Sequence, residues 1–108
     1  MSTVPTIRFI NVDCEVIKGC YANNQVSLEL VAADTDHNLI QDVIPGEPFG
    51  AASVCLADHK FHGSLTAIRN YSENSGILEL LSEAGLVKET GQIIYGKYVE
   101  FPIVTVTF

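Results

Sequence analysis

Strict alternation of apolar and polar residues in the first half of the chain constrains the fold more than any other feature. The alternation runs through residues 10–16 and again through residues 25–32. A period of two is typical of β-strands that bury one face, because successive side chains point to opposite sides of a sheet. Residues 19–24 contain a glycine and two asparagines and supply a turn between the two runs. The pattern therefore predicts an antiparallel hairpin.

The residues that follow predict further short strands. Residues 34–38, with the sequence DTDHN, are typical of a turn, because their side chains bond their own backbone. Residues 39–44 then predict a third strand, which Pro45 and Pro48 end. Residues 49–72 are less regular, and the apolar runs at 54–56 and 65–68 fit either two short strands or a strand and a turn.

One amphipathic helix is predicted near residues 74–84. Four apolar residues recur there at the spacing i, i+3, i+4 and i+7, which forms one stripe on a helix: Ile77, Leu80, Leu81 and Ala84. Ser72 or Asn74 is suited to cap its first turn. Gly85 lies where a helix commonly ends in a left-handed residue.

The end of the chain predicts the strongest strand. Thr90 and Gly91 indicate a turn, residues 92–95 a short strand, and residues 97–108 the closing strand. The phase of the alternation changes at Pro102, which is typical of a sheet edge or a bulge because proline donates no hydrogen bond to a neighbouring strand. Residues 1–108 are therefore predicted to form a single α+β domain, an antiparallel β-sheet of four to six strands with one main helix packed on one face.

Composition limits the classes of function. The 108 residues carry 6 Lys and Arg against 13 Asp and Glu, a net charge of −7, and the basic residues are scattered singly, so we expect no nucleic-acid binding. There is no apolar run long enough for a membrane span and no signal-peptide pattern, so we expect no membrane association and a cytoplasmic location. Three cysteines without a CxxC pair predict no disulfide framework.

The residues from Cys55 to His62 form the one cluster that suggests ligand chemistry. Cys55, Asp58, His59 and His62 lie within eight residues, and cysteine and histidine are ligands for zinc. Cys55, His59 and His62 are therefore the candidates for a metal or small-ligand site, and a Cys–His nucleophile pair is the enzymatic version. Against these, the run SVCLA predicts that Cys55 packs as a small apolar residue. No cofactor is expected, because no glycine-rich phosphate loop occurs.

The aromatic and apolar residues of the closing strand suggest a protein interface instead. We expect this strand, with apolar residues on both faces, to lie at a sheet edge, where it can extend the sheet onto a partner protein or across a two-fold axis into a homodimer. The predicted interface residues are Tyr98, Phe101, Val104, Val106 and Phe108. We therefore expect a non-enzymatic interaction module. A further alternative is acidic mimicry of DNA, since residues 1–58 carry a net charge of −6.

Residues 70–106 also resemble a known group of proteins. The stretch has an Asn-Tyr-Ser-Glu-Asn start at residue 70, the helix exit Ala84-Gly85-Leu86-Val87, Thr90-Gly91 and a final strand with Pro102. In these features it is similar to the C-terminal half of small uncharacterised bacterial and mobile-element proteins. The shared motifs are capping and turn signals, so the resemblance implies a common local structure and assigns no activity or site residue.

Overall fold

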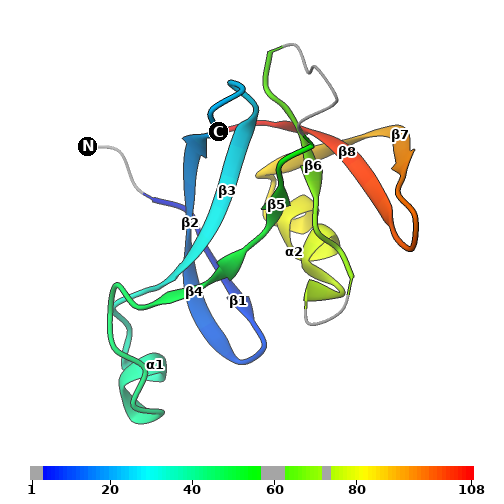
Figure 1. The fold of residues 1–108 in the computed structure, drawn as a ribbon. Coiled ribbons are helices and arrows are strands. Elements are labelled where there is room, and N and C mark those ends of the chain that lie inside the picture. Colours follow the sequence, from blue (N-terminus) through cyan, green and yellow to red (C-terminus); the bar gives the residue numbers. More distant parts are fainter. Residues whose placement is uncertain (1–3, 57–62, 72–73) are drawn as a thin grey trace.

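The computed structural model describes residues 4–56, 63–71 and 74–108. Over these residues, the fold consists of two antiparallel β-sheets and two short helices (Figure 1). Along the chain, the elements are β1 (Thr6–Phe9), β2 (Val12–Cys20), β3 (Val26–Ala32), α1 (Asp36–Ile40), β4 (Pro48–Ala51), β5 (Ser53–Val54), β6 (Leu65–Ile68), α2 (Ile77–Glu83), β7 (Val87–Tyr95) and β8 (Glu100–Val106). The predicted α+β class is confirmed, although the strands divide between two four-stranded sheets where the sequence predicted one sheet.

The first sheet contains the predicted hairpin. Its strand order is β1-β2-β3-β4, and β2 pairs with β3 in a register that sets Val16 opposite Leu30. These two side chains, together with those of Cys14 and Leu28, are buried. The alternation in the sequence thus places one face of the hairpin in the core, as a period of two requires.

The second sheet has the order β5-β6-β8-β7. The run at 65–68 forms β6, whereas only Val54 of the run at 54–56 belongs to a strand, β5. β7 begins earlier than the sequence predicted, at Val87, and Thr90-Gly91 is part of this strand. The register of β7 against β8 shifts between Glu89 and Ile93. Thr90 and Gly91 therefore form a bulge in a continuous strand, where the sequence indicated a turn.

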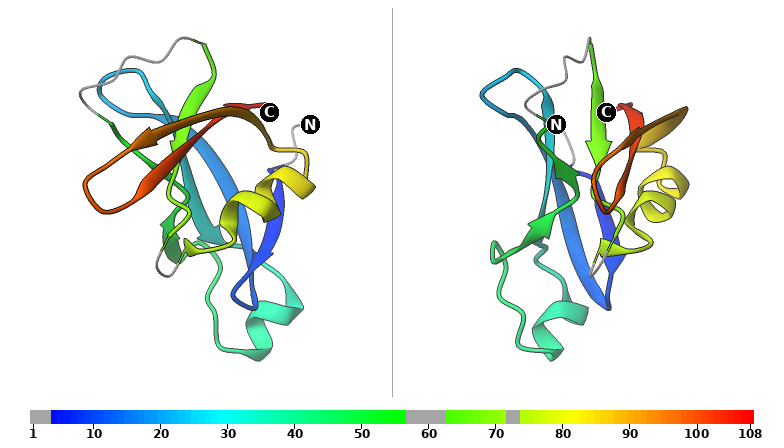
Figure 2. Two further views of the ribbon diagram at one scale, coloured as in Figure 1. Left: turned by 90° about the vertical axis from the view of Figure 1, so that its right-hand side faces the viewer. Right: turned by 45° about the vertical axis from the view of Figure 1, so that its right-hand side comes forward.

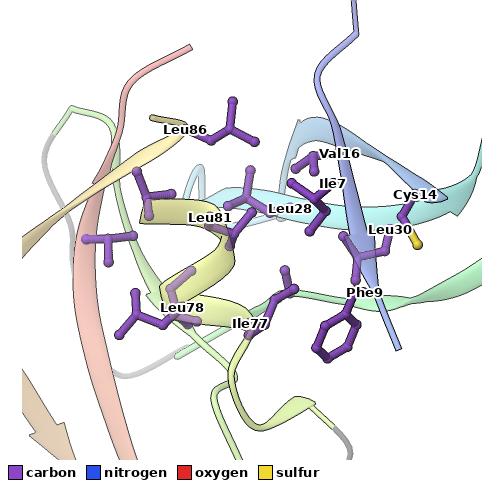
Figure 3. Packing of buried hydrophobic residues seen from close by; sticks show 14 of the residues in the cluster. Ile7, Phe9, Cys14, Val16, Leu28, Leu30, Ile77, Leu78, Leu81 and Leu86 are labelled. Atoms are coloured by element: carbon purple, nitrogen blue, oxygen red, sulfur yellow. The ribbon is translucent and has the colours of Figure 1, made fainter. Parts of the chain in front are cut away.

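Helix α2 lies along one side of the molecule, in contact with β1 and β7, which are the outer described strands of the two sheets (Figure 2). Figure 3 shows Ile77 and Leu81 pointing toward Leu28 and the residues of β1. Both helix residues are fully buried, and each such side chain contributes about 1.5–3 kcal/mol through removal of its surface from water. The predicted apolar stripe is therefore only partly the core face of the helix. Ile77 and Leu81 are buried together with Leu78, whereas Leu80 is partly buried and Ala84, beyond the end of α2, is exposed.

The ends of α2 are only partly as predicted. Gly85 adopts the expected left-handed conformation, with φ of 75°. At the start, Asn74 is not the cap, and Ser72 lies outside the described residues. The side-chain oxygen of Asn70 instead accepts hydrogen bonds from the backbone N–H groups of Gly76 and Leu78, at 3.0 and 3.2 Å. A side chain from the preceding segment thus satisfies the free donors of the first turn.

The predicted strand at residues 39–44 is wrong, because this segment contains the end of α1 and a turn. Thr35 caps α1 by accepting a hydrogen bond from the backbone N–H of Asn38 at 3.2 Å. The Asn38 side chain is completely buried and bonds to the backbone of Asp13 in β2. Capping and this distant contact decide the local structure against the apolar run.

Candidate functional site

An open hollow in the described surface lies at the end of the β7–β8 hairpin. It is an open groove of about 570 Å³, lined by Asn70, Tyr71, Tyr95, Gly96, Lys97, Tyr98, Val99, Glu100 and Pro102. The hairpin extends away from the rest of the molecule in Figure 1. We call this site the tyrosine groove, after Tyr71, Tyr95 and Tyr98.

The hairpin turn fixes the geometry of one wall of the groove. The backbone N–H of Gly96 donates to the carbonyl of Val99 at 2.8 Å. A Cβ atom on Gly96 would lie 2.8 Å from Cε2 of Phe101 and 3.0 Å from the Val99 oxygen, closer than van der Waals contact permits. Glycine therefore lets the Phe101 ring pack close to the turn, and any side chain at this position would force the ring to shift. Tyr95 directly precedes this turn and Tyr98 lies within it, and their side chains are 72% and 87% exposed.

The opposite wall comes from the segment that precedes α2. The ring of Tyr71 packs edge-on against Phe101, with 6.0 Å between ring centroids and 72° between planes. The guanidinium carbon of Arg69 lies 5.5 Å from the centroid of Tyr71, and Nζ of Lys97 lies 5.5 Å from that of Tyr98. Two tyrosines of the groove thus each carry a cation over the ring face, the arrangement of a cation–π contact.

The predicted interface residues divide between the groove and the core. Tyr98 lines the groove and Phe101 supports it. Val104 and Val106 are buried in the core, and Phe108 packs against that core with Nζ of Lys18 5.6 Å from its ring centroid. The valines therefore cannot contact a partner in this fold.

The premise that the closing strand is a sheet edge is wrong. β8 lies between β6 and β7, and among the described strands β7 is the outermost on that side. β6 pairs with β8 only from Ile103 onward, so Pro102 occupies a stretch of β8 that has β7 as its one strand neighbour in the described part of the chain. This position tolerates a residue without an N–H group.

The predicted ligand cluster is only partly described. Cys55 is exposed directly after β5, so the prediction that it packs as a small apolar residue is wrong. His59 and His62 lie outside the described residues. Within residues 4–56, 63–71 and 74–108, no three His, Cys, Asp or Glu side chains are grouped as metal ligands. The site at Cys55, His59 and His62 stays a prediction.

The sequence alone did not predict that basic residues lie over the tyrosine rings of this groove. Tyr95 and Tyr98 flank Gly96-Lys97 in the sequence, but Arg69 and Tyr71 are more than twenty residues away from them. Only the pairing of β6 with β8 brings the two segments together. The close spacing of Arg69 with Tyr71 and of Lys97 with Tyr98 was the available local signal.

Membrane spanning was also predicted to be absent. In the described part of the chain, neither helix is long and apolar enough to cross a bilayer. The chain matches no protein-family model, no curated protein and no solved structure. The resemblance of residues 70–106 to bacterial and mobile-element proteins therefore stays a prediction.

Proposed function

We propose that this domain is a non-enzymatic interaction module that binds an extended segment of a partner protein in the tyrosine groove. The observation that carries the proposal is the exposure of Tyr95 and Tyr98, before and within the turn that Gly96 closes. Tyrosine combines a large apolar ring with a hydroxyl group and loses little conformational entropy on binding, and it is enriched at protein interfaces for these reasons.

The neighbouring strand supports an extended partner. β7 is the outermost described strand of its sheet on that side, and its bulge at Thr90-Gly91 interrupts the edge. The short stretch Ile93–Tyr95 beyond the bulge leads directly into the groove. A partner strand of a few residues can bond to this backbone while its side chains enter the groove. The bulge, in turn, opposes the long edge-to-edge pairing that leads to aggregation.

Charge favours a protein over a nucleic acid as the occupant. The groove is lined by one lysine and one glutamate, Lys97 and Glu100, and the chain as a whole carries a net charge of −7. Binding to a phosphate backbone needs several clustered cations and a favourable overall field. Stacking of partner side chains on the tyrosines needs neither.

A displayed library of random peptides tests the proposal. We expect wild-type protein to enrich a sequence motif, and the variant Tyr95→Ser/Tyr98→Ser to lose that enrichment without a change in melting temperature, because both rings are exposed. Ile17→Ser serves as the matched control, since Ile17 is a partly exposed residue of β2 outside the groove. In an amide NMR titration, the enriched peptide should perturb residues 69–71 and 93–102.

Two results would contradict the proposal. One is a motif that the tyrosine variant enriches equally well. The other is self-association through the groove, seen by sedimentation as a concentration-dependent mass that the Tyr95→Ser/Tyr98→Ser variant loses. The latter would assign the groove to a second copy of the chain, as in the homodimer that the sequence suggested.

A further inference from the structure

A second exposed apolar surface lies at the end of the molecule that carries α1, away from the β7–β8 hairpin (Figure 1). Its large apolar side chains are each more than half exposed: Ile10, Leu39, Ile40 and Ile44. We call this surface the α1 end. Ile10 belongs to the turn between β1 and β2, and the others belong to α1 and the turn that follows it. Most exposed apolar residues on a protein occur singly, so a group from two adjoining segments calls for an explanation.

Hydrogen bonds hold these two segments against each other. The side-chain N–H₂ of Asn11 donates to Gln41 Oε1 at 2.9 Å, and Gln41 Nε2 donates to the backbone carbonyl of Asn11 at 3.0 Å. Nε2 of His37 lies 2.9 Å from the same carbonyl. The buried Asn38 fixes α1 to β2. The apolar side chains are therefore presented by an ordered surface whose shape is set before a partner arrives.

Ile10 has an unfavourable backbone conformation, and its side chain gains little burial in the free domain to offset the strain. Ile10 and Asn11 have φ of 48° and 62° in the two-residue turn between Phe9 and Val12. Such turns favour asparagine and glycine, whereas positive φ strains a β-branched residue. The Ile10 side chain is nonetheless 60% exposed. A strained residue that buries little in the free domain is typical of a functional position.

The charge around the α1 end has one sign. Four exposed acidic residues lie within residues 34–47, which contain no lysine or arginine: Asp34, Asp36, Asp42 and Glu47. On the neighbouring strand β1, Arg8 is engaged by Asp13, with Nε and Oδ1 2.7 Å apart. A partner that covers the isoleucines therefore meets a negative field and is favoured when it brings positive charge.

We propose that the α1 end docks a basic amphipathic segment of a partner protein, one that sets apolar side chains on the exposed isoleucines and Lys or Arg beside the surrounding acids. The inference is independent of the tyrosine groove, which lies at another end of the molecule and has different chemistry. The negative field disfavours anionic lipid surfaces and nucleic acids at this site.

A fluorescently labelled amphipathic peptide of leucine and lysine is a suitable probe, with a leucine–glutamate peptide of the same pattern as its counterpart. We expect the basic peptide to bind and the acidic one not to bind, as measured by fluorescence anisotropy. Ile40→Ser should weaken binding by about tenfold and leave the melting temperature unchanged, because Ile40 is 84% exposed. Tyr98→Ser, at the other surface, is the matched control and should bind as wild type does.

Ile10→Asn gives a result that a purely structural residue would not give. Asparagine accepts positive φ, so the variant should melt a few degrees higher than wild type. The same variant should bind the basic peptide about tenfold more weakly, because it loses an apolar contact. Stability and binding therefore move in opposite directions.

Several outcomes would overturn the inference. Undiminished binding of the basic peptide to both Ile40→Ser and Ile10→Asn would show that only diffuse charge attracts it. Binding to vesicles with anionic lipid, lost in Ile40→Ser, would assign the surface to a membrane. A concentration-dependent mass that Ile40→Ser abolishes would assign it to a second copy of the chain. None of these results depends on whether the tyrosine groove binds a peptide.

Discussion

Replacement of Asn38 by alanine should destabilise the domain more than its place near one end of the molecule suggests. The Asn38 side chain is fully buried and makes three hydrogen bonds to backbone groups. Its oxygen accepts from the N–H of Asp13 at 2.8 Å, and its amide donates to the carbonyls of Asp13 and Ala33 at 2.8 and 2.9 Å. A single side chain thus continues the pairing of β2 beyond the point where β3 ends.

The expected loss follows from what each backbone group retains. The carbonyl of Asp13 keeps the N–H of Ala33 as a donor at 2.9 Å, whereas the N–H of Asp13 loses the acceptor that Asn38 provides. A buried donor without a partner costs about 1–3 kcal/mol, and each of the other hydrogen bonds contributes about 0.5–1.5 kcal/mol net. We therefore expect the free energy of unfolding to fall by about 3 kcal/mol, which corresponds to a decrease in melting temperature of about 15 °C for a domain of this size.

Urea denaturation followed by circular dichroism measures this loss under two-state conditions. Gln41→Ala is the matched control, because it removes exposed hydrogen bonds of the same helix end and should cost less than about 0.5 kcal/mol. Asn38→Asp should be at least as destabilising as Asn38→Ala, since a carboxylate donates nothing to the two carbonyls. A loss below about 1 kcal/mol in Asn38→Ala would refute the reasoning, because water would then replace the side chain.

Three further predictions concern other parts of the fold. Gly96→Ala should lower the free energy of unfolding by about 1–3 kcal/mol in urea denaturation, because its Cβ would lie 2.8 Å from the ring of Phe101; an unchanged value would mean that the ring moves freely. Burial, and to a smaller extent the charge of Asp13, raises the pKa of the Cys14 thiol to about 11. A thiol reagent should therefore modify the exposed Cys20 and Cys55 in the native protein, and Cys14 only on unfolding. Modification of all three cysteines at one rate would contradict this prediction. Hydrogen bonds from Arg8 and then Thr35 lower the pKa of Asp13. The ionised Asp13 should therefore stabilise the fold fully above about pH 4, and this stabilisation should be lost as the pH falls through the lowered pKa. If Asp13→Asn loses stability in acid as steeply as wild type does, Asp13 is not the group responsible.

Elements with local periodicity could be predicted from the sequence. The hairpin of β2 and β3 and the core face of α2 depend on alternation and on a stripe such as Ile77 and Leu81, which the sequence displays directly. Helix α1 could not be predicted in this way, because Asn38 is stabilised by backbone groups of Asp13, twenty-five positions away. Thr90-Gly91 has the composition of a turn, and only pairing with β8 makes it a bulge.

The candidate surfaces were predictable only in their components. Tyr98 and Phe101 were proposed from sequence as interface residues, but Val104 and Val106 were grouped with them because alternation does not tell an edge strand from an inner one. The inner place of β8 depends on its pairing with β6, which is more than thirty residues earlier in the chain. The exposure of the side chains in the tyrosine groove and at the α1 end likewise depends on how the whole chain folds, so local sequence patterns do not predict it.

The acidic residues in the first half of the chain have different roles in the folded structure. Asp13 is engaged by Arg8 and Thr35 and serves the fold, whereas the exposed acids of residues 34–47 belong to the same segment as the exposed Ile40 and Ile44. A mimic of DNA presents charge that binds its target mainly through electrostatic attraction, so salt should abolish that binding. A surface that combines acids with exposed apolar side chains should retain part of its affinity at high salt, because the burial of isoleucine is not screened. The combination therefore favours a basic amphipathic partner over a protein that reads charge alone.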